Sequence, residues 1–157
     1  MTEAEVEQAT AIGTERYRRA REAGQAPRYG YNEADPEGTD VLGAAAELVV
    51  ANFLGVEWRA ALTVERDVDV EGYHVRATRY ATGRLRIHPD DSGIFILVTG
   101  TVPNLMIRGC HRAESCKRPE FWDEPQPGRP AWFVPQSELH SIRHLLVAER
   151  RRRARGE

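Results

Sequence analysis

The sequence predicts a single domain that mixes helices with a β-sheet, which is an α/β or α+β fold. Its 157 residues are enough for one domain whose core needs neither disulfides nor a structural metal. Apolar residues recur at steps of three and four over residues 41–53, a spacing typical of a helix. Residues 73–78 alternate instead, and residues 94–98 form an uninterrupted apolar run. This run predicts a strand that is buried on both faces.

The N-terminal segment, residues 1–38, is predicted to be a helix followed by a linker. Residues 2–23 contain no proline, and their apolar residues recur at loose helical spacing among charges. An exposed amphipathic helix should therefore end at Gly24. Residues 25–38 are rich in proline, glycine and tyrosine, a composition typical of a loop. If any part of the chain is a detachable arm, it is this segment.

A second helix is predicted to start at a cap provided by Thr39 or Asp40 and to stop at Gly55. Its apolar stripe consists of Val41, Leu42, Ala45, Leu48, Val49 and Phe53. Glu47 is the exception among these apolar side chains. A lone carboxylate at such a position costs free energy unless it reaches a partner or the edge of the helix.

From residue 58 the pattern changes to β, with alternation over 64–70 and 73–78 and apolar residues at Leu85 and Ile87. Further on, we expect a short helix near 113–117, a strand over 131–134 and a final helix that begins at Ser137. The apolar residues of the final helix are Leu139, Ile142, Leu145 and Leu146. The expected organisation is an arm, a domain over 39–149 and a basic tail over 150–157.

Charge is distributed unevenly along the chain. Residues 1–57 carry a net charge of −6, whereas residues 137–157 carry +3. The acidic segment favours a protein partner. The basic tail can neutralise the phosphates of DNA, but it can equally be a solvated helix end that offsets the helix dipole. Its arginines are Arg150, Arg151, Arg152, Arg153 and Arg155.

Membrane insertion and secretion are not expected. No run approaches the roughly 20 apolar residues that span a bilayer. The start of the sequence is acidic and lacks the basic and apolar regions of a secretory signal. Two cysteines cannot form a disulfide framework, so a reducing cytoplasm is the expected compartment.

A β-hairpin is predicted around Glu71 and Gly72, because glycine supplies the positive φ that a two-residue turn needs. In the register that this turn sets, we expect Val70 to pair with Tyr73 and the apolar face of the hairpin to lie toward the core. The opposite, polar face gathers Asp67, Asp69, His74 and Arg76. These residues are either an ordinary solvated face with a cross-strand ion pair or the beginning of a site. Arg86 and His88 are expected to continue the same face on the next strand.

Several segments together resemble a phage-type family of the PD-(D/E)XK nuclease superfamily. The resemblance covers about residues 42–146, and it rests on the order and spacing of the pieces. The matching pieces are Gly43–Glu47, Asp69–Thr78, Gly83–Ile87, Leu97–Gly100, Pro103, Ile107–Gly109 and Val134–Leu139.

The resemblance implies a restriction-endonuclease-like fold, which is a mixed sheet flanked by helices. It also implies that the protein cuts DNA with the help of a divalent metal. Glu47 would take the place of the family's helix glutamate, and Asp69 would match the aspartate of the motif. His74 and Arg76 depart from the family's second acidic residue and lysine. Imidazole is a poorer ligand for Mg²⁺ than for Mn²⁺, so the identity of the metal stays open. Arg76 can stabilise a phosphate but cannot be a general base.

Other groups suggest weaker hypotheses. Cys110, His111 and Cys116 offer soft ligands without the fourth that structural zinc usually has. His140 and His144 are expected at the surface or its boundary. The aromatic residues that could stack on bases, but are expected to pack within the protein, are Phe121, Trp122, Trp132 and Phe133.

The leading hypothesis is therefore a metal-dependent DNA nuclease. Its metal ligands would be Glu47, Asp69 and His74, Arg76 would contact the phosphate, and Arg86 would bind DNA together with the tail. The alternative is a non-catalytic protein that binds nucleic acid or a host protein. A nuclease-like site requires that the Glu47 carboxylate converge on Asp69.

Overall fold

The structure is a computed structural model that describes residues 1–25, 34–62 and 68–156. Its helices are α1 (Glu3–Glu22), α2 (Pro36–Leu54), the short α3 (Ala113–Cys116) and α4 (Arg143–Ala154). Its strands are β1 (Tyr73–Thr78), β2 (Leu85–Ile87), β3 (Ile94–Thr101), β4 (Asn104–Arg112), β5 (Trp122–Asp123) and β6 (Ala131–Val134). Two short 3₁₀ turns cover Pro119–Phe121 and Gln136–Glu138. The mixed α+β class is confirmed, as are the predicted short helix near 113–117 and the strand over 131–134.

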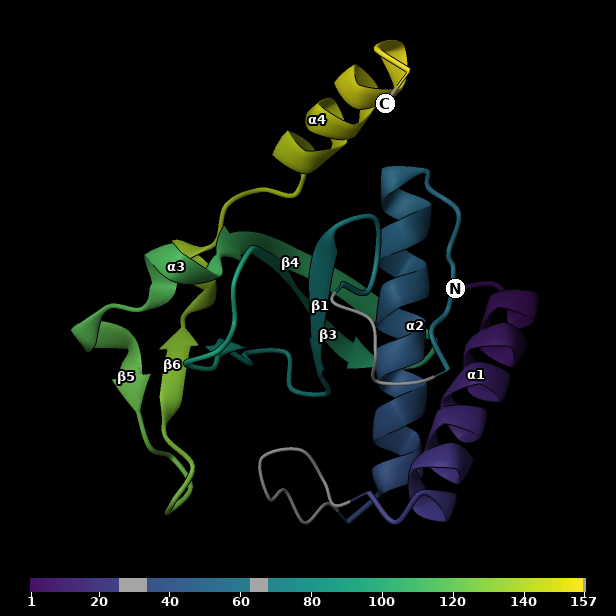
Figure 1. The fold of residues 1–157 in the computed structure, drawn as a ribbon, viewed down its shortest axis with the longest axis horizontal. Coiled ribbons are helices and arrows are strands. Elements are labelled where there is room, and N and C mark those ends of the chain that lie inside the picture. Colours follow the sequence, from purple (N-terminus) through teal and green to yellow (C-terminus); the bar gives the residue numbers. More distant parts are fainter. Residues whose placement is uncertain (26–33, 63–67, 157) are drawn as a thin grey trace.

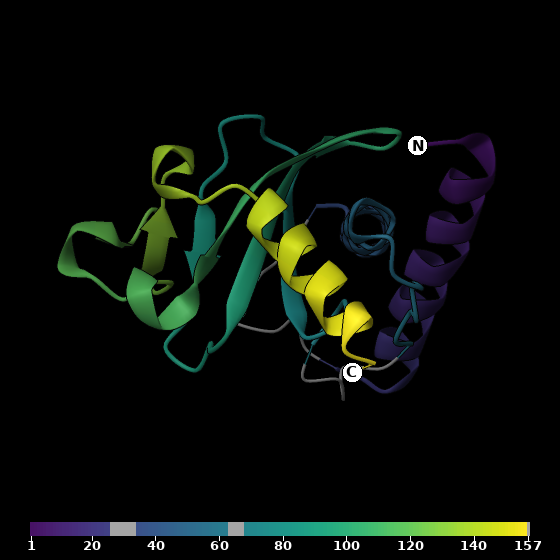
Figure 2. The ribbon, with the colours of Figure 1, turned by 90° about the horizontal axis from the view of Figure 1, so that it is seen from above.

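The strands form two three-stranded sheets. The first sheet has the order β1-β3-β4, with β1 parallel and β4 antiparallel to β3. The second has the order β2-β6-β5 and is antiparallel throughout. Across the molecule, α1 lies against α2, α2 covers one face of the first sheet, and the second sheet lies on the other side of it (Figures 1 and 2).

Strand β3 is the centre of the fold. Ile96 and Val98 join the apolar core that α2 and α4 cover, whereas Phe95 and Leu97 join the core shared with the second sheet. All four side chains are buried. The prediction of a strand buried on both faces is confirmed.

Helix α1 has the predicted extent, but it is not an exposed arm. A capping box between Thr2 and Glu5 fixes its start, and it ends just before Gly24. Ala9 and Gly13 are buried against α2, and a Cβ on Gly13 would lie 2.4 Å from the Cα of Val41. This close contact between two backbones requires glycine and joins the N-terminal helix to the domain.

Helix α2 starts earlier than predicted. The Asp35 side chain, and not Thr39 or Asp40, caps it by accepting a hydrogen bond from the Gly38 amide at 3.0 Å. Gly55 ends the helix in the left-handed conformation, φ 67°, as predicted. The predicted stripe misplaces Phe53, whose side chain is 39% exposed. Because α1 and the first sheet cover different sides of α2, its buried surface is wider than one stripe.

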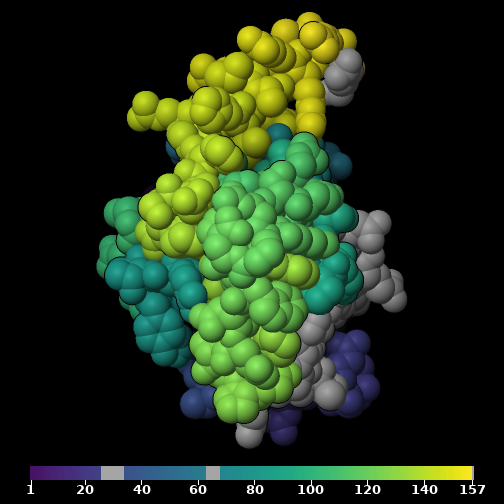
Figure 3. All heavy atoms as spheres, turned by 90° about the vertical axis from the view of Figure 1, so that its left-hand side faces the viewer, coloured from purple at the N-terminus to yellow at the C-terminus, as the bar shows by residue number. Residues whose placement is uncertain are grey.

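The final helix starts later than predicted, at Arg143 instead of Ser137. His140 first makes two backbone hydrogen bonds of 2.9 Å with Cys110 of β4, which keeps this segment extended. Gly109 permits the approach, because a Cβ there would lie 2.7 Å from the His140 carbonyl oxygen. Ile142 and Leu145 then anchor the start of α4 in the core, and the helix forms one end of the molecule, next to the end of α2 (Figures 1 and 3).

The predicted hairpin is limited to its turn. Val70 and Tyr73 form the expected bridge around Glu71 (φ 42°) and Gly72 (φ 87°). Beyond the turn, β1 pairs with β3 in parallel, and Val68 and Asp69, the described residues directly before the bridge, are not in a strand. Residues 63–67, and with them the predicted pairing of Asp67, lie outside the described residues.

The prediction that β2 continues the polar face of β1 is wrong. Strand β2 belongs to the second sheet, where Arg86 is paired in register with Phe133 of β6. The Arg86 side chain is exposed, and His88 after the strand is buried. Burial lowers the pKa of His88.

Candidate functional site

Glu47 has a partner that sequence patterns did not identify, Arg16 of α1. The Arg16 guanidinium donates two hydrogen bonds to Glu47, at 2.8 Å to Oε1 and 2.9 Å to Oε2. The indole N–H of Trp58 donates a third, at 3.1 Å to Oε2. The carboxylate in the middle of the apolar helix is thus satisfied by a forked ion pair.

Asp69 lies just before the turn that leads into β1, and its backbone N–H donates to the carbonyl of Tyr73 at 2.9 Å. Its Oδ2 accepts the backbone N–H of Val75 at 2.7 Å, so the side chain binds β1, which is an edge strand among the described strands of the first sheet. Burial raises the pKa of Glu47, and the negative charge of Asp69 adds to this rise. Burial opposes the rise in the pKa of Arg16, which the Glu47 contacts and, to a lesser degree, the charge of Asp69 cause. Glu47 and Asp69, the two acidic residues singled out from the sequence, therefore act on the same guanidinium.

The Glu47 carboxylate is nearly inaccessible to solvent, and its side chain is 9% exposed. Burial raises the pKa of Glu47, because removal from water disfavours the charged form. The hydrogen bonds and positive charge of Arg16, with the Trp58 hydrogen bond, counteract this rise.

His74 and Arg76 lie on the face of the first sheet that is turned to the second sheet, where both are partly buried. The His74 ring stacks on Phe95 at a centroid distance of 4.3 Å, and the Arg76 guanidinium lies 4.7 Å from the centroid of the same ring. Phe95 belongs to the core on the side of the second sheet, whereas α2 covers the opposite face. Arg76 is neutralised by Asp91, with contacts of 3.1 and 3.2 Å. The first sheet thus lies between Glu47 on one side and His74 and Arg76 on the other.

The three predicted metal ligands do not form a metal site. Within residues 1–25, 34–62 and 68–156, no three His, Cys, Asp or Glu side chains are grouped so that they could hold a metal ion. Both oxygens of Glu47 are bound to Arg16, and His74 stacks on Phe95. The residues present therefore do not fit the metal that the resemblance implies.

The arginines of α4 and of the turn after it, which include the five tail arginines predicted to bind DNA, fall into two groups. Arg152 pairs with the buried Glu149 at 3.0 Å, and Arg153 donates to the carbonyl of Gly55. Within the part of the chain that the structure describes, the exposed arginines without such a contact are Arg143, Arg150 and Arg151 of α4 and Arg155 directly after it. Arg152 and Arg153, which line the cavity described below although they are exposed, are called the inward arginines, and the other four are called the outward arginines.

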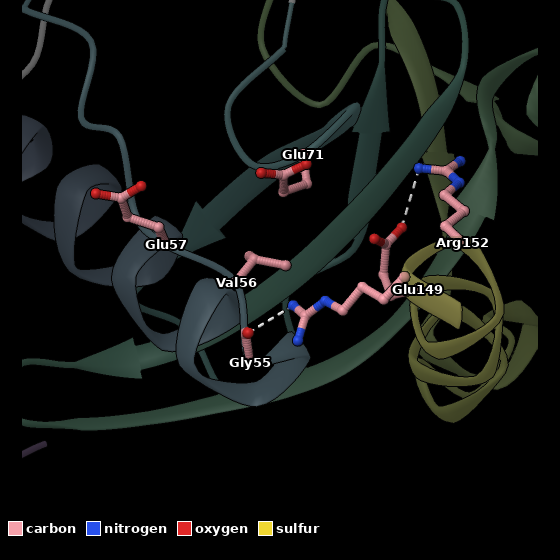
Figure 4. A pocket seen from close by; sticks show the side chains of 7 residues that line it. Gly55, Val56, Glu57, Glu71, Glu149 and Arg152 are labelled. Atoms are coloured by element: carbon pink, nitrogen blue, oxygen red, sulfur yellow. Dashed lines mark hydrogen bonds and ion pairs between the residues drawn. The ribbon is translucent and has the colours of Figure 1, made fainter. Parts of the chain in front are cut away.

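The inward arginines line a cavity of about 470 Å³ between α4, the end of α2 and the turn before β1 (Figure 4). Its lining residues are Gly55, Val56, Glu57, Glu71, Glu149, Arg152 and Arg153. Glu149 accepts a hydrogen bond from the Tyr73 hydroxyl at 2.8 Å, and burial with this contact raises the pKa of Tyr73 to about 12. These interactions fix α4 to the body of the protein.

The cysteines and aromatic residues of the weaker hypotheses have different environments in the structure. Cys110 and Cys116 are free, buried thiols in different cores, so they do not share a ligand set. Trp122 is 46% exposed and meets Trp132 edge to face, with the ring centroids 4.6 Å apart. The two rings line a groove together with Lys117 and Pro119. The expectation of internal packing holds for Phe121, which is buried, but not for Trp122.

Arg16 is the residue that sequence analysis missed. A signal for it exists in the spacing of Ala9, Gly13 and Arg16, because steps of four and three place the three residues on one helix face. Ala9 and Gly13 are small enough for close helix packing. An arginine on the same face is then brought to the neighbouring helix.

No known protein family, curated protein or solved structure matches this chain. None of the helices that the structure describes is long and apolar enough to span a membrane.

Proposed function

We propose that this chain is a non-catalytic protein that binds duplex DNA through the outward arginines of α4. The observation that carries the proposal is the division of the helix. Glu149, its one acidic residue, is buried and bound internally, whereas Arg143, Arg150 and Arg151 of the helix and Arg155 directly after it are exposed to solvent.

The spacing of these arginines suits a row of phosphates. From Arg143 to Arg155 the helix rises about 18 Å at about 1.5 Å per residue. Each strand of the duplex has one phosphate about every 3.4 Å along the axis. Four guanidinium groups spread over the length of this helix can therefore reach several phosphates. Such contacts carry no base specificity.

A protein partner is less well supported. The exposed large apolar side chains among the described residues are distributed one to an element or loop: Phe53, Tyr80, Met106, Trp122 and Val147. Stable protein interfaces have an apolar core, whereas phosphate binding needs exposed cations. The distribution of side chains on α4 favours the latter.

The nuclease hypothesis remains a proposal with a direct test. Because Glu47 is bound to Arg16 and separated from His74, we expect no cleavage of duplex or single-stranded DNA with Mg²⁺ or Mn²⁺ beyond an EDTA control. Cleavage that is lost in Asp69→Asn would establish the nuclease instead and contradict the non-catalytic assignment.

We expect DNA affinity to depend steeply on salt and to depend on α4. In the variant Arg150→Gln/Arg151→Gln/Arg155→Gln, the log–log slope of affinity against salt should fall by roughly 0.9 for each lost phosphate contact. The measurement is fluorescence anisotropy with a labelled duplex of random sequence at several salt concentrations.

A matched control removes the same charge elsewhere. Arg18→Gln/Arg19→Gln/Arg21→Gln also replaces three helical arginines, two of which are already paired with Glu15. This control should leave the slope unchanged. An equal fall in the slope for both variants would mean that only the net charge of the protein matters. An unchanged slope for the α4 variant would mean that its arginines are solvated and offset the helix dipole instead of binding DNA.

A further inference from the structure

Glu149 lines the cavity between α4, the end of α2 and the turn before β1, and it leaves one carboxylate oxygen without a donor. Tyr73 and Arg152 both donate to Oε1, at 2.8 and 3.0 Å. Among the described residues, none donates to Oε2, although the Glu149 side chain is only 6% exposed (Figure 4). A carboxylate oxygen that is largely removed from water favours a hydrogen-bond donor. A ligand with an N–H group would supply that donor.

The two inward arginines have N–H groups left for a ligand. A guanidinium carries five N–H donors. In the contacts that the structure describes, Arg152 uses one donor on Glu149, and Arg153 uses one on the carbonyl of Gly55 at 2.5 Å. Both arginine side chains line the cavity. The wall that α4 forms therefore presents a carboxylate oxygen and guanidinium N–H groups side by side.

This wall matches the two charged groups of an α-amino acid, which are attached to one carbon atom. The ammonium of such a ligand would donate to Oε2 of Glu149, and its carboxylate would accept from Arg152 and Arg153. Hydrogen bonds between charged groups are the strong ones. The cavity of about 470 Å³ is within the size range of small-molecule sites, so it has room for the side chain of the ligand as well.

Two further carboxylates, those of Glu57 and Glu71, line the cavity away from α4 (Figure 4). Glu57 pairs with Arg59, whereas Glu71 makes no hydrogen bond or ion pair within the described part of the chain. Glu71 also has a φ of 42°, a backbone conformation that is unfavourable for residues other than glycine and that occurs preferentially at functional sites. Glu71 is therefore suited to a cationic side chain.

We propose that this cavity binds a free α-amino acid with a cationic side chain, such as lysine. Glu149 and Arg152 hold its α-ammonium and carboxylate, and Glu71 holds its side-chain ammonium. Among the lining residues, three carboxylates stand against two guanidinium groups, so the single net positive charge of such a ligand balances the site. The proposal does not depend on DNA binding by α4, because the inward arginines are not among those assigned to DNA.

The test is isothermal titration of the full chain with L-lysine and three analogues, each of which lacks one of its charges. L-Norleucine lacks the side-chain ammonium, 1,5-diaminopentane lacks the carboxylate, and 6-aminohexanoate lacks the α-ammonium. We expect one L-lysine to bind and each analogue to bind at least about tenfold more weakly, because each analogue loses a charge-assisted hydrogen bond. No binding of L-lysine, or binding of 1,5-diaminopentane that equals it, would overturn the proposal.

Variants of the lining residues assign the three contacts. Glu149→Gln and Arg152→Gln should each lower the affinity for L-lysine at least about tenfold. In Glu71→Gln, L-lysine should bind no better than L-norleucine, whose own affinity should stay that of the wild type. Glu138→Gln, which removes an exposed carboxylate outside the cavity lining, should leave both affinities unchanged.

Arg152→Gln keeps the test decisive if Glu149→Gln does not fold, because the Arg152 side chain is 51% exposed. Wild-type affinity for L-lysine in either folded variant would contradict the binding of the α-ammonium and carboxylate at α4. A preference for L-lysine over L-norleucine that persists in Glu71→Gln would contradict the contact of the side-chain ammonium with Glu71.

Discussion

Arg16→Met should lower the free energy of unfolding by about 3–5 kcal/mol near pH 8, because it leaves the buried Glu47 charge without its partner. The side chains of the pair are 19% and 9% exposed, so solvent screens their interaction little. Urea unfolding followed by circular dichroism measures the loss.

The loss should shrink at low pH. Burial already raises the pKa of Glu47 in the folded protein, and removing Arg16 raises it further. A carboxyl whose folded-state pKa is raised favours the fold at pH values below its unfolded pKa, and this contribution disappears as the pH rises through the folded pKa. The difference between wild type and variant should therefore be smallest near pH 4 and grow toward pH 8.

Arg18→Met is the control for this pH series. Arg18 pairs with Glu15 and Glu22 at the exposed side of α1, and surface pairs contribute little. We expect its unfolding curves to follow those of the wild type at each pH. A loss for Arg16→Met that does not change with pH would mean that Glu47 is not the group left unpaired.

Phe95→Ala should cost about 3–5 kcal/mol of unfolding free energy, the usual range for a buried phenylalanine. Phe95, near the start of β3, is 1% exposed, and it supports the His74 ring and the Arg76 guanidinium as well as the core. Its removal leaves a cavity and takes away the surface on which both side chains lie. The midpoint of urea unfolding gives the change.

Phe53→Ala makes the same chemical change at the end of α2, where the ring is 39% exposed. We expect a loss below about 1 kcal/mol, because little apolar surface returns to water. Similar losses for the two variants would contradict the arrangement of β3 between two cores.

Local features of this protein could be predicted from the sequence because they depend on nearby residues. The two long helices, the glycine stop at Gly55 and the turn at Glu71 and Gly72 follow from spacing and backbone preference. The burial of β3 on both faces follows from an uninterrupted apolar run. The requirement that Glu47 have a partner could also be predicted, because a carboxylate among apolar residues of a helix needs one.

The tertiary structure decided which segments meet. Alternation shows which side chains share a face of β1, but it does not say whether the neighbour is the preceding segment or β3, 21 residues further on at the Tyr73–Ile94 pair. Glu47 and Arg16 are 31 residues apart, and their contact depends on the close packing of α1 and α2 at Gly13. The partner of a buried charge is set by this packing, because many arginines in the sequence could neutralise it and only the fold brings one within hydrogen-bonding distance.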